Sequence, residues 1–191
     1  MIIGVTGKSG SGKTTLSKEI ARNFGGKWID MDQVCHEALN VPTNISYLCK
    51  KCGTNILGAD GTINRKKLGE IVFSDETKMQ ELQHITWSYM EQIVDEVLEK
   101  RHDNLVILDA IRLPETKYWQ QCDIKILAIA NETERKEQVM KRDNITEEYF
   151  QQRDSSSISY STEEFDLIYE CHYQQQDLTN FIQKLKDSLS V

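Results

Sequence analysis

The sequence predicts an α/β fold built on a doubly wound parallel sheet of five strands. Residues 105–108 are a continuous apolar run and residues 124–130 are apolar at every position but Lys125, a pattern typical of parallel strands that are covered on both faces. Helical patterns separate these runs from the other expected strands, and alternating strands and helices favour a parallel sheet. The third observation is the order at the N-terminus, where an apolar strand over residues 2–5 leads into a glycine-rich loop and then a helix.

The helix after this loop has one apolar face. Leu16, Ile20 and Phe24 are four residues apart, which is the spacing of one side of a helix. A glycine pair at residues 25–26 then favours termination, because glycine readily takes the left-handed conformation that ends a helix. We expect the second strand at residues 27–29.

The next stretch is mostly helical. A helix is expected over residues 33–40, ending before Pro42 because a proline disfavours helical geometry in the residue that precedes it. Residues 44–62 are expected to be irregular or to form a short helix, and residues 64–73 to form another helix. A long helix is expected over residues 76–101. Its core-facing stripe has apolar side chains at steps of three and four: Met79, Leu82, Ile85, Tyr89, Ile93 and Val97.

The C-terminal half continues the alternation. Pro114 opens an expected short helix that ends at residue 121. Two polar helices, residues 133–142 and 146–153, have little apolar surface, and mobile helices of this kind suit a lid that excludes water from a reaction. The remaining elements are a flexible serine-rich connection at residues 155–157, a strand at 166–171 and a closing helix at 178–189.

The glycine-rich loop fits a phosphate-binding motif. Residues 7–14 read GKSGSGKT and match G-x-x-x-x-G-K-[ST] at every fixed position, with the required strand before and helix after. Glycines let the backbone turn its N–H groups towards phosphate oxygens, and the helix N-terminus adds a positive dipole end. We expect Lys13 to reach the β- and γ-phosphates and Thr14 to hold Mg²⁺, whereas a glycine-rich turn that binds nothing is the alternative. The residues expected to bind ATP are Gly7, Ser9, Gly10, Ser11, Gly12, Lys13, Thr14 and Thr15.

Three aspartates follow expected strands. Asp30 and Asp32 come after the second strand, and Asp109 ends the apolar run at residues 105–108. Because ligands of doubly wound sheets sit outside the carboxyl ends of the strands, we expect these aspartates to converge on the phosphate loop. A carboxylate there can accept the proton of a hydroxyl nucleophile, and Asp32 is the candidate, with Asp30 or Asp109 helping through Mg²⁺ or its waters. Helix capping is the alternative for Asp30 and Asp32.

Composition narrows the class of protein. The 191 residues suffice for one α/β domain with small insertions. A formal net charge of −7 argues against nucleic-acid and anionic-membrane partners, although a phosphorylated small molecule needs only a local basic pocket. The N-terminus reads as strand and loop without a signal peptide, and no apolar run has the length of a membrane span. We therefore expect a cytoplasmic protein.

The five cysteines are scattered along the chain. Their odd number favours reduced thiols over a disulfide framework. Cys49 and Cys52 form a C-x-x-C pair, which occurs in zinc and redox sites, but a zinc site needs a second pair of ligands nearby. We interpret the pair as packed or surface thiols.

Further motifs give the sequence a resemblance to a known family. Residues 29–36 read IDMDQVCH, and residues 60–75 read DGTINRKKLGEIVFSD. Together these two segments are much more specific than the phosphate loop. The other matching positions are Leu82, residues 85–86 and 141–143, Glu147 and Arg153. Over nearly the whole chain the pattern resembles the dephospho-CoA kinases, which catalyse the last step of coenzyme A synthesis.

The resemblance implies a P-loop kinase fold in three parts. A nucleotide-binding core would comprise residues 1–41, 103–132 and 160–191, a helical acceptor-binding insertion residues 42–102, and a helical lid residues 133–159. The implied reaction transfers the γ-phosphoryl group of ATP to the ribose 3′-hydroxyl of dephospho-CoA, with Mg²⁺ as cofactor. The implied partner is this small molecule, with no nucleic acid, membrane or obligate protein partner.

The resemblance also assigns roles to single residues. Arg142 matches the family's lid arginine, which meets the charge on the transferring phosphate. Arg65 lies among basic residues at the start of an expected helix, where they oppose the helix dipole; a bound anion would compensate, and a solvated face is the alternative. The implied catalytic residues are Lys13, Asp32 and Arg142, and the implied substrate-binding residues are Asp32, Arg65, Asp109 and Arg135.

The chain departs from the family pattern on the acceptor and lid side. The family's second lid arginine is Gln138 here, and we expect Arg135, on the same helix face, to supply the missing charge. A solvated surface role is the alternative for Arg135. A histidine-proline pair is replaced by Trp87 and Ser88, and a lid glutamine by Ser157.

Two other functions fit the phosphate loop. The first is a different small-molecule kinase, such as a nucleoside or nucleotide kinase, on the same scaffold. The second is a diverged protein that binds ATP without transferring phosphate. A GTPase is disfavoured because no N-K-x-D segment follows the loop.

Overall fold

The computed structural model describes residues 1–101, 104–155 and 157–189. The chain divides into two compact units, one formed by Met1–Asp30 with Arg101–Val191 and the other by Met31–Lys100. The predicted flexible connection at residues 155–157 includes Ser156, which lies outside the described residues.

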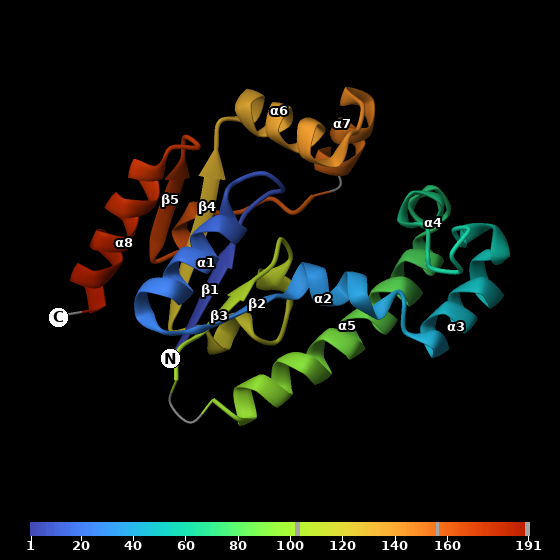
Figure 1. The fold of residues 1–191 in the computed structure, drawn as a ribbon, viewed down its shortest axis with the longest axis horizontal. Helices are drawn as coiled ribbons and strands as arrows, with labels where there is room; N and C mark the ends of the chain where they lie inside the picture. Colours follow the sequence, from blue (N-terminus) through green and yellow to red (C-terminus); the bar gives the residue numbers. More distant parts are fainter. Residues whose placement is uncertain (102–103, 156, 190–191) are drawn as a thin grey trace. The chain divides into compact units, whose positions relative to one another are not determined.

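The first unit contains the predicted sheet of five parallel strands. The strands are β1 (Ile2–Thr6), β2 (Lys27–Asp30), β3 (Val106–Asp109), β4 (Ile124–Ala130) and β5 (Leu167–Cys171). Their order in the sheet is β2-β3-β1-β4-β5, and every pairing is parallel (Figure 1). The order reverses beside β1, so β1 and the loop after it lie at the switch point where such sheets bind ligands.

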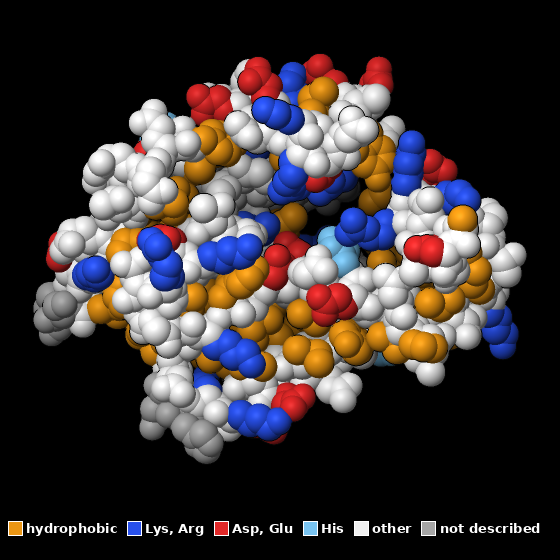
Figure 2. Space-filling model, viewed as in Figure 1, with side chains coloured by type: hydrophobic (Ala, Val, Ile, Leu, Met, Phe, Trp, Pro, Cys, Tyr) orange, Lys and Arg blue, Asp and Glu red, His pale blue; other side chains and the backbone are white. Residues whose placement is uncertain are grey.

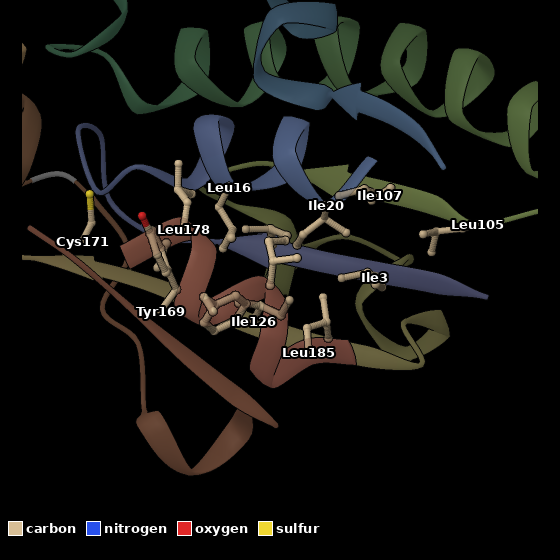
Figure 3. Close-up of a cluster of buried hydrophobic side chains, with 14 residues drawn as sticks. Ile3, Leu16, Ile20, Leu105, Ile107, Ile126, Tyr169, Cys171, Leu178 and Leu185 are labelled. Atoms are coloured by element: carbon tan, nitrogen blue, oxygen red, sulfur yellow. The ribbon is translucent and has the colours of Figure 1, made fainter. Parts of the chain in front are cut away.

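Two helices cover one face of this sheet. They are α1 (Lys13–Phe24) and α8 (Gln175–Leu189), which pack against each other and against the strands. Figure 3 shows Leu16 and Ile20 of α1 and Leu185 of α8 meeting side chains of the strands in a buried cluster. Fully buried side chains of this kind are the main source of folding free energy.

The opposite face of β1 contacts a short 3₁₀ segment, η2 (Leu113–Glu115), which in turn contacts a second one, η3 (Trp119–Gln121). The single helix expected up to residue 121 is therefore wrong. Thr116, between the two segments, has an extended backbone, and its hydroxyl donates to the Leu113 carbonyl oxygen at 2.8 Å. A side chain that bonds its own backbone in this way competes with continuous helix formation.

The helix pair α6 (Glu132–Asp143) and α7 (Glu147–Ser155) follows β4 in the first unit (Figure 1). Asn131 caps the start of α6 by accepting bonds from two backbone N–H groups. Asn144 ends the helix in the left-handed conformation, with φ 51°. Both helices are polar, as predicted, and they begin and end within two residues of the expected positions.

The second unit is helical. It consists of α2 (Met31–Ala38), α3 (Pro42–Cys52), the 3₁₀ turn η1 (Thr54–Ile56), α4 (Arg65–Val72) and α5 (Glu76–Glu99). Its core comprises Leu39, Leu48, Ile56, Ile63, Leu68 and Val72, with Met79, Leu82 and Ile85 of α5 packed against it. The predicted stripe of α5 thus contributes to this core.

Pro42 starts a helix in the second unit. Residues 44–62 were expected to be irregular or to form a short helix, whereas α3 runs for 11 residues from Pro42. Proline is well suited to the first turn of a helix, because its missing N–H would have no intrahelical partner there.

Within residues 1–101, 104–155 and 157–189, no helix combines the length and apolar character needed to cross a bilayer.

Candidate active site

The loop between β1 and α1 has a shape that requires glycine. Gly7, Gly10 and Gly12 have φ values of 150°, 84° and 84°. A Cβ on Gly7 would lie 2.2 Å from the Ala128 carbonyl oxygen, and one on Gly12 would lie 2.7 Å from Cys171 Sγ. Both distances are well inside van der Waals contact. The loop backbone is thus packed directly against the sheet, with a curvature that only glycine allows.

The start of α1 has the features of an anion site. Gly12 is the N-cap residue and supplies no side-chain bond, and the first turn of α1 contains no acidic residue. Backbone N–H groups at a helix N-terminus lack intrahelical partners and, with the helix dipole, attract phosphate. Thr14 and Thr15 lie in this first turn, Thr14 half-buried and Thr15 exposed. Ser11, within the loop, is buried.

We expect Gly12→Ala to disable nucleotide binding. The new methyl group would meet Cys171, and φ would stay in a region that alanine rarely adopts, so the loop must move. Displacing preorganised N–H donors should lower kcat/KM for ATP about 100-fold or more. Titration with a fluorescent ATP analogue measures the binding part of this loss.

Gly25→Ala is the matched control. Gly25 ends the same helix at φ 69°, but a Cβ there meets nothing within 4 Å. This variant should lose about 1 kcal/mol of stability and keep nucleotide affinity. Equal losses of nucleotide affinity in both variants would show that backbone strain at a glycine, and not the shape of residues 7–14, explains the weaker binding.

Lys13 and two aspartates lie at the same edge of the sheet. The strand register pairs Asp30 with Asp109 and Asp109 with Val5, so both carboxylates lie at the carboxyl end of the sheet, Asp109 beside β1 and Asp30 one strand further away. Asp109 is fully buried, and Lys13 Nζ lies 4.0 Å from its Oδ1. Lys13 is thereby held at the loop by a buried counter-charge.

Two arginines, one on α6 and one on α7, converge on Ser9 of the loop. Arg142 Nη2 donates to Ser9 Oγ at 3.2 Å, and Arg153 Nη2 donates to the same oxygen at 3.4 Å. Asp143 joins the two, accepting from Arg142 Nε at 2.7 Å and from Arg153 Nη1 at 2.8 Å. Positive charge from α6 and α7 therefore meets the middle of the phosphate loop.

Arg135 is a third cation beside the loop. It is only 4% exposed, so the alternative of a solvated surface residue is wrong. Its Nη1 donates to the Ser9 carbonyl oxygen at 3.1 Å and to Asp154 Oδ1 at 2.7 Å. Figure 2 shows Lys and Arg side chains on the side of α6 and α7 that faces the loop, and both acidic and basic side chains on their outer side.

The arginine cluster should withstand moderate acid. Hydrogen bonds from Arg142 lower the pKa of Asp143 to about 2, with a further contribution from Arg153 against the opposing effect of burial. A carboxylate whose folded pKa lies below its ordinary value contributes stability above that ordinary value and loses it as the pH falls through the folded pKa.

We therefore expect the Arg142–Asp143–Arg153 contacts to persist from neutral pH to about pH 3 and to open near pH 2. A carbon-13 NMR titration of the Asp143 carboxyl measures this directly. A midpoint near pH 4, the ordinary value for aspartate, would contradict the pairing.

A pocket of about 430 Å³ adjoins the loop. Gly12, Lys13 and Thr15 line it on one side, and Gln138 and Tyr173 on the other. The Tyr173 hydroxyl donates to the Gly10 carbonyl oxygen at 2.8 Å, and burial raises the pKa of Tyr173 to about 12, which keeps this donor protonated.

The role of Tyr173 escaped sequence analysis. It lies in the segment after β5 and has a φ of 58°, unusual for a residue with a side chain. Its place just beyond the carboxyl end of the last strand was the available signal, since loops at that edge line ligand sites. Gln174 and Leu178, which also line the pocket, follow the same strand.

Two of the predicted site residues belong to the second unit. Asp32 is half-buried in the first turn of α2. Arg65 is exposed in the first turn of α4, where Asn64 caps the helix by accepting from Lys67 N. Their roles stay predictions.

The cysteines of the chain are free thiols. Cys49 and Cys52 pack at the edge of the second unit's core, and burial raises the pKa of Cys52, which disfavours its thiolate. Among the described residues, no group of three or more His, Cys, Asp and Glu side chains could hold a metal ion. The geometry thus gives no support to a zinc or redox role for the C-x-x-C pair.

The fold and loop together define the class. A phosphate loop between β1 and α1 of a parallel sheet in the order β2-β3-β1-β4-β5, with arginines of the following helix pair on the loop, characterises the P-loop kinases. A protein of Thermus thermophilus has the same fold, with a TM-score of 0.79 and 24% identity over 99% of this chain and 97% of that one.

Sequence comparison identifies the family. The family model described as dephospho-CoA kinase matches residues 1–165. A dephospho-CoA kinase of Aquifex aeolicus is 33% identical over 79% of this chain and 77% of its own length. One from Fusobacterium nucleatum is 28% identical over 99% and 98%. The chain belongs to the dephospho-CoA kinase family.

Proposed function

We propose that the protein transfers the γ-phosphoryl group of ATP to the 3′-hydroxyl of dephospho-CoA and so forms coenzyme A. The observation that carries the proposal is the glycine cradle of residues 7–14 with Lys13 at its end and lid arginines on Ser9. Family membership over residues 1–165 supports the choice of reaction. The phosphate loop alone would support a nucleotide-binding protein and no more.

The residues at the loop fit a magnesium nucleotide. The cradle would be filled by any Cβ, and the N-terminus of α1 lacks a side-chain cap, so both favour an anionic ligand. Thr14 would hold Mg²⁺ through its hydroxyl. The Asp109 carboxylate, which lies 4.0 Å from Lys13 Nζ at the end of the loop, would help to hold the ion through its bound waters. Mg²⁺ supplies charge neutralisation between the β- and γ-phosphates when it is bound.

Lys13 and Arg142 would stabilise charge during transfer. Lys13 reaches from the first residue of α1, and Arg142 from the last turn of α6, with its side chain 58% exposed and its guanidinium at the loop. Positive groups placed where charge develops lower the barrier without reorganisation at the moment of reaction. The pocket next to Tyr173 would then hold the nucleoside of ATP.

Asp32 would act as the base. A 3′-hydroxyl attacks phosphorus only if its proton leaves, and a carboxylate can accept that proton as the bond forms. Asp32 lies two residues after Asp30, the end of β2, whose register partner is Asp109.

The acceptor would be bound by the helical insertion, residues 42–102. Arg65 begins α4 with Lys66 and Lys67, and this first turn contains no acidic residue. A phosphate of dephospho-CoA would offset the unfavourable placement of basic residues at a helix N-terminus. Residues 133–159 would serve as the lid over the nucleotide, and residues 1–41, 103–132 and 160–191 as the core.

A substrate panel tests the proposed function. The purified chain is given Mg-ATP with dephospho-CoA, with nucleosides or with nucleoside monophosphates, and ADP formation is followed. Phosphorylation of dephospho-CoA well above all the others is the expected result. Preference for a nucleoside or nucleotide would assign another kinase activity, and ATP binding without transfer to any acceptor would identify a non-catalytic protein.

A further inference from the structure

One carboxylate of the lid joins the lid to the phosphate loop. Asp154 in α7 accepts from Arg135 Nη1 of α6 at 2.7 Å and from Lys8 Nζ of the loop at 3.1 Å. Arg135 Nη1 also donates to the Ser9 carbonyl oxygen at 3.1 Å. These bonds connect the phosphate loop to two consecutive helices that follow it by 126 and 146 positions in the sequence.

The buried position of Arg135 depends on this carboxylate. The Arg135 side chain is 5% exposed and that of Asp154 is 17% exposed. A guanidinium stays protonated even when buried, so it requires a counter-charge within hydrogen-bond distance. The Phe150 ring, with its centroid 5.3 Å from Arg135 Cζ, adds a cation–π contact but no negative charge.

The cations around Ser9 divide into two kinds. Arg142, whose side chain is 58% exposed, shares Asp143 with Arg153 and bonds the Ser9 hydroxyl from the solvent side. Arg135 is buried and bonds the Ser9 backbone. The exposed arginine is placed to meet a ligand, and the buried one is placed to support the loop.

We propose that Asp154 is a positioning residue for phosphoryl transfer. It holds Arg135 and Lys8 so that the Ser9 carbonyl, and with it the middle of the phosphate loop, keeps one position beside the lid. This role rests on the proposed kinase function. It assigns Arg135 to the support of the loop, whereas the sequence led us to expect direct contact with the substrate.

The burial and hydrogen bonds support this role over simple surface pairing. Burial acts to raise the pKa of Asp154, but the bonds from Arg135 and Lys8 outweigh it, so the pKa lies below its ordinary value and the group is ionised at neutral pH. An exposed pair contributes little and is screened by salt, but a pair of this kind fixes both partners. Small displacements of groups that position a substrate can slow a reaction by about 100-fold.

The test compares four variants of the full chain. Asp154→Asn removes the charge at constant size, Arg135→Gln removes its partner, and a double variant removes both. Glu148→Gln, at an exposed position of the same helix, is the matched control. Each is measured by hydrogen exchange over residues 7–14 without nucleotide, by thermal unfolding, and by kcat and KM for ATP.

We expect Asp154→Asn to speed exchange in the loop at least about 10-fold, because a buried tie to the loop is lost. We expect kcat to fall about 10-fold or more while KM for ATP changes less than about threefold, because Lys13 and the N-terminus of α1, which Asp154 does not contact, stay in place. The double variant should unfold at a higher temperature than Asp154→Asn alone, since it leaves no buried unpaired charge, and should keep the low kcat.

Several results would overturn this role. One such result is that Asp154→Asn shows the same amide hydrogen exchange over residues 7–14, or the same kcat, as Glu148→Gln. Another is recovery of kcat together with stability in the double variant, which is what a merely structural pair predicts. If the unaltered chain forms no coenzyme A, the proposed function fails, and the exchange measurement alone then decides whether Asp154 holds the loop.

Discussion

Lys13→Ala should lower kcat/KM for ATP about 1,000-fold, the upper range for the loss of one preorganised charge at a reacting group. The ammonium group is the cation expected at the β- and γ-phosphates, and in the protein it lies 4.0 Å from the buried Asp109. Without it, Asp109 would place negative charge beside the phosphates with no partner from Lys13. Both the affinity for ATP and the rate of phosphoryl transfer should therefore fall.

The control for this change lies on the same helix. Lys18→Ala also removes a lysine from α1, but Lys18 is exposed and its Nζ lies over the Trp28 ring, 4.6 Å from the centroid. Its loss should leave turnover unchanged. Steady-state assays and calorimetric titration with ATP separate the two variants, and a loss below about threefold for Lys13→Ala would remove Lys13 from the mechanism.

Asp32→Asn should slow transfer about 100-fold or more and leave ATP affinity unchanged, because an amide cannot accept the proton of the attacking hydroxyl. The amide has nearly the size of the carboxylate, so the packing of α2 is conserved. Single-turnover measurement with saturating ATP and dephospho-CoA isolates the chemical step from binding and release.

Helix stabilisation is the competing explanation for Asp32, which lies in the first turn of α2. Asp75→Asn provides the comparison, since Asp75 caps α5 in the same unit by accepting from Lys78 N at 3.1 Å. Asparagine can still accept this bond, so losing the charge at the helix start should cost only about 0.3–1 kcal/mol of stability, without affecting turnover. If Asp32→Asn behaves in the same way, Asp32 supports its helix and the base must be sought elsewhere.

The features that sequence analysis predicted correctly are those encoded by local patterns. The sheet follows from apolar runs such as residues 105–108, and the position of the loop follows from its glycines and Lys13. Helix α2 ends before Pro42, as expected, but Pro42 itself starts α3, two residues before the segment in which a short helix was one of two expectations. The single helix expected up to residue 121 is wrong, because Thr116 bonds its own backbone and interrupts it.

The site was only partly predictable because its remaining contacts join distant parts of the chain. Asp154 meets Lys8 across 146 positions, and the Tyr173 hydroxyl meets the Gly10 carbonyl across 163. No spacing rule relates such residues, since their contact depends on how α7 and the segment after β5 fold back on the loop. Sequence analysis singled out Arg135 as a substrate-binding residue, which stays a prediction, and its burial against Asp154 could not be read from periodicity.

The most direct test of the proposed function follows the γ-phosphoryl group itself. The chain is incubated with Mg²⁺, dephospho-CoA and ATP labelled in the γ-phosphate, and the product is examined by phosphorus NMR and mass spectrometry. We predict one labelled coenzyme A for each ATP consumed, with the label on the ribose 3′-oxygen. Label released only as inorganic phosphate, at a rate independent of dephospho-CoA, would contradict transfer to this acceptor.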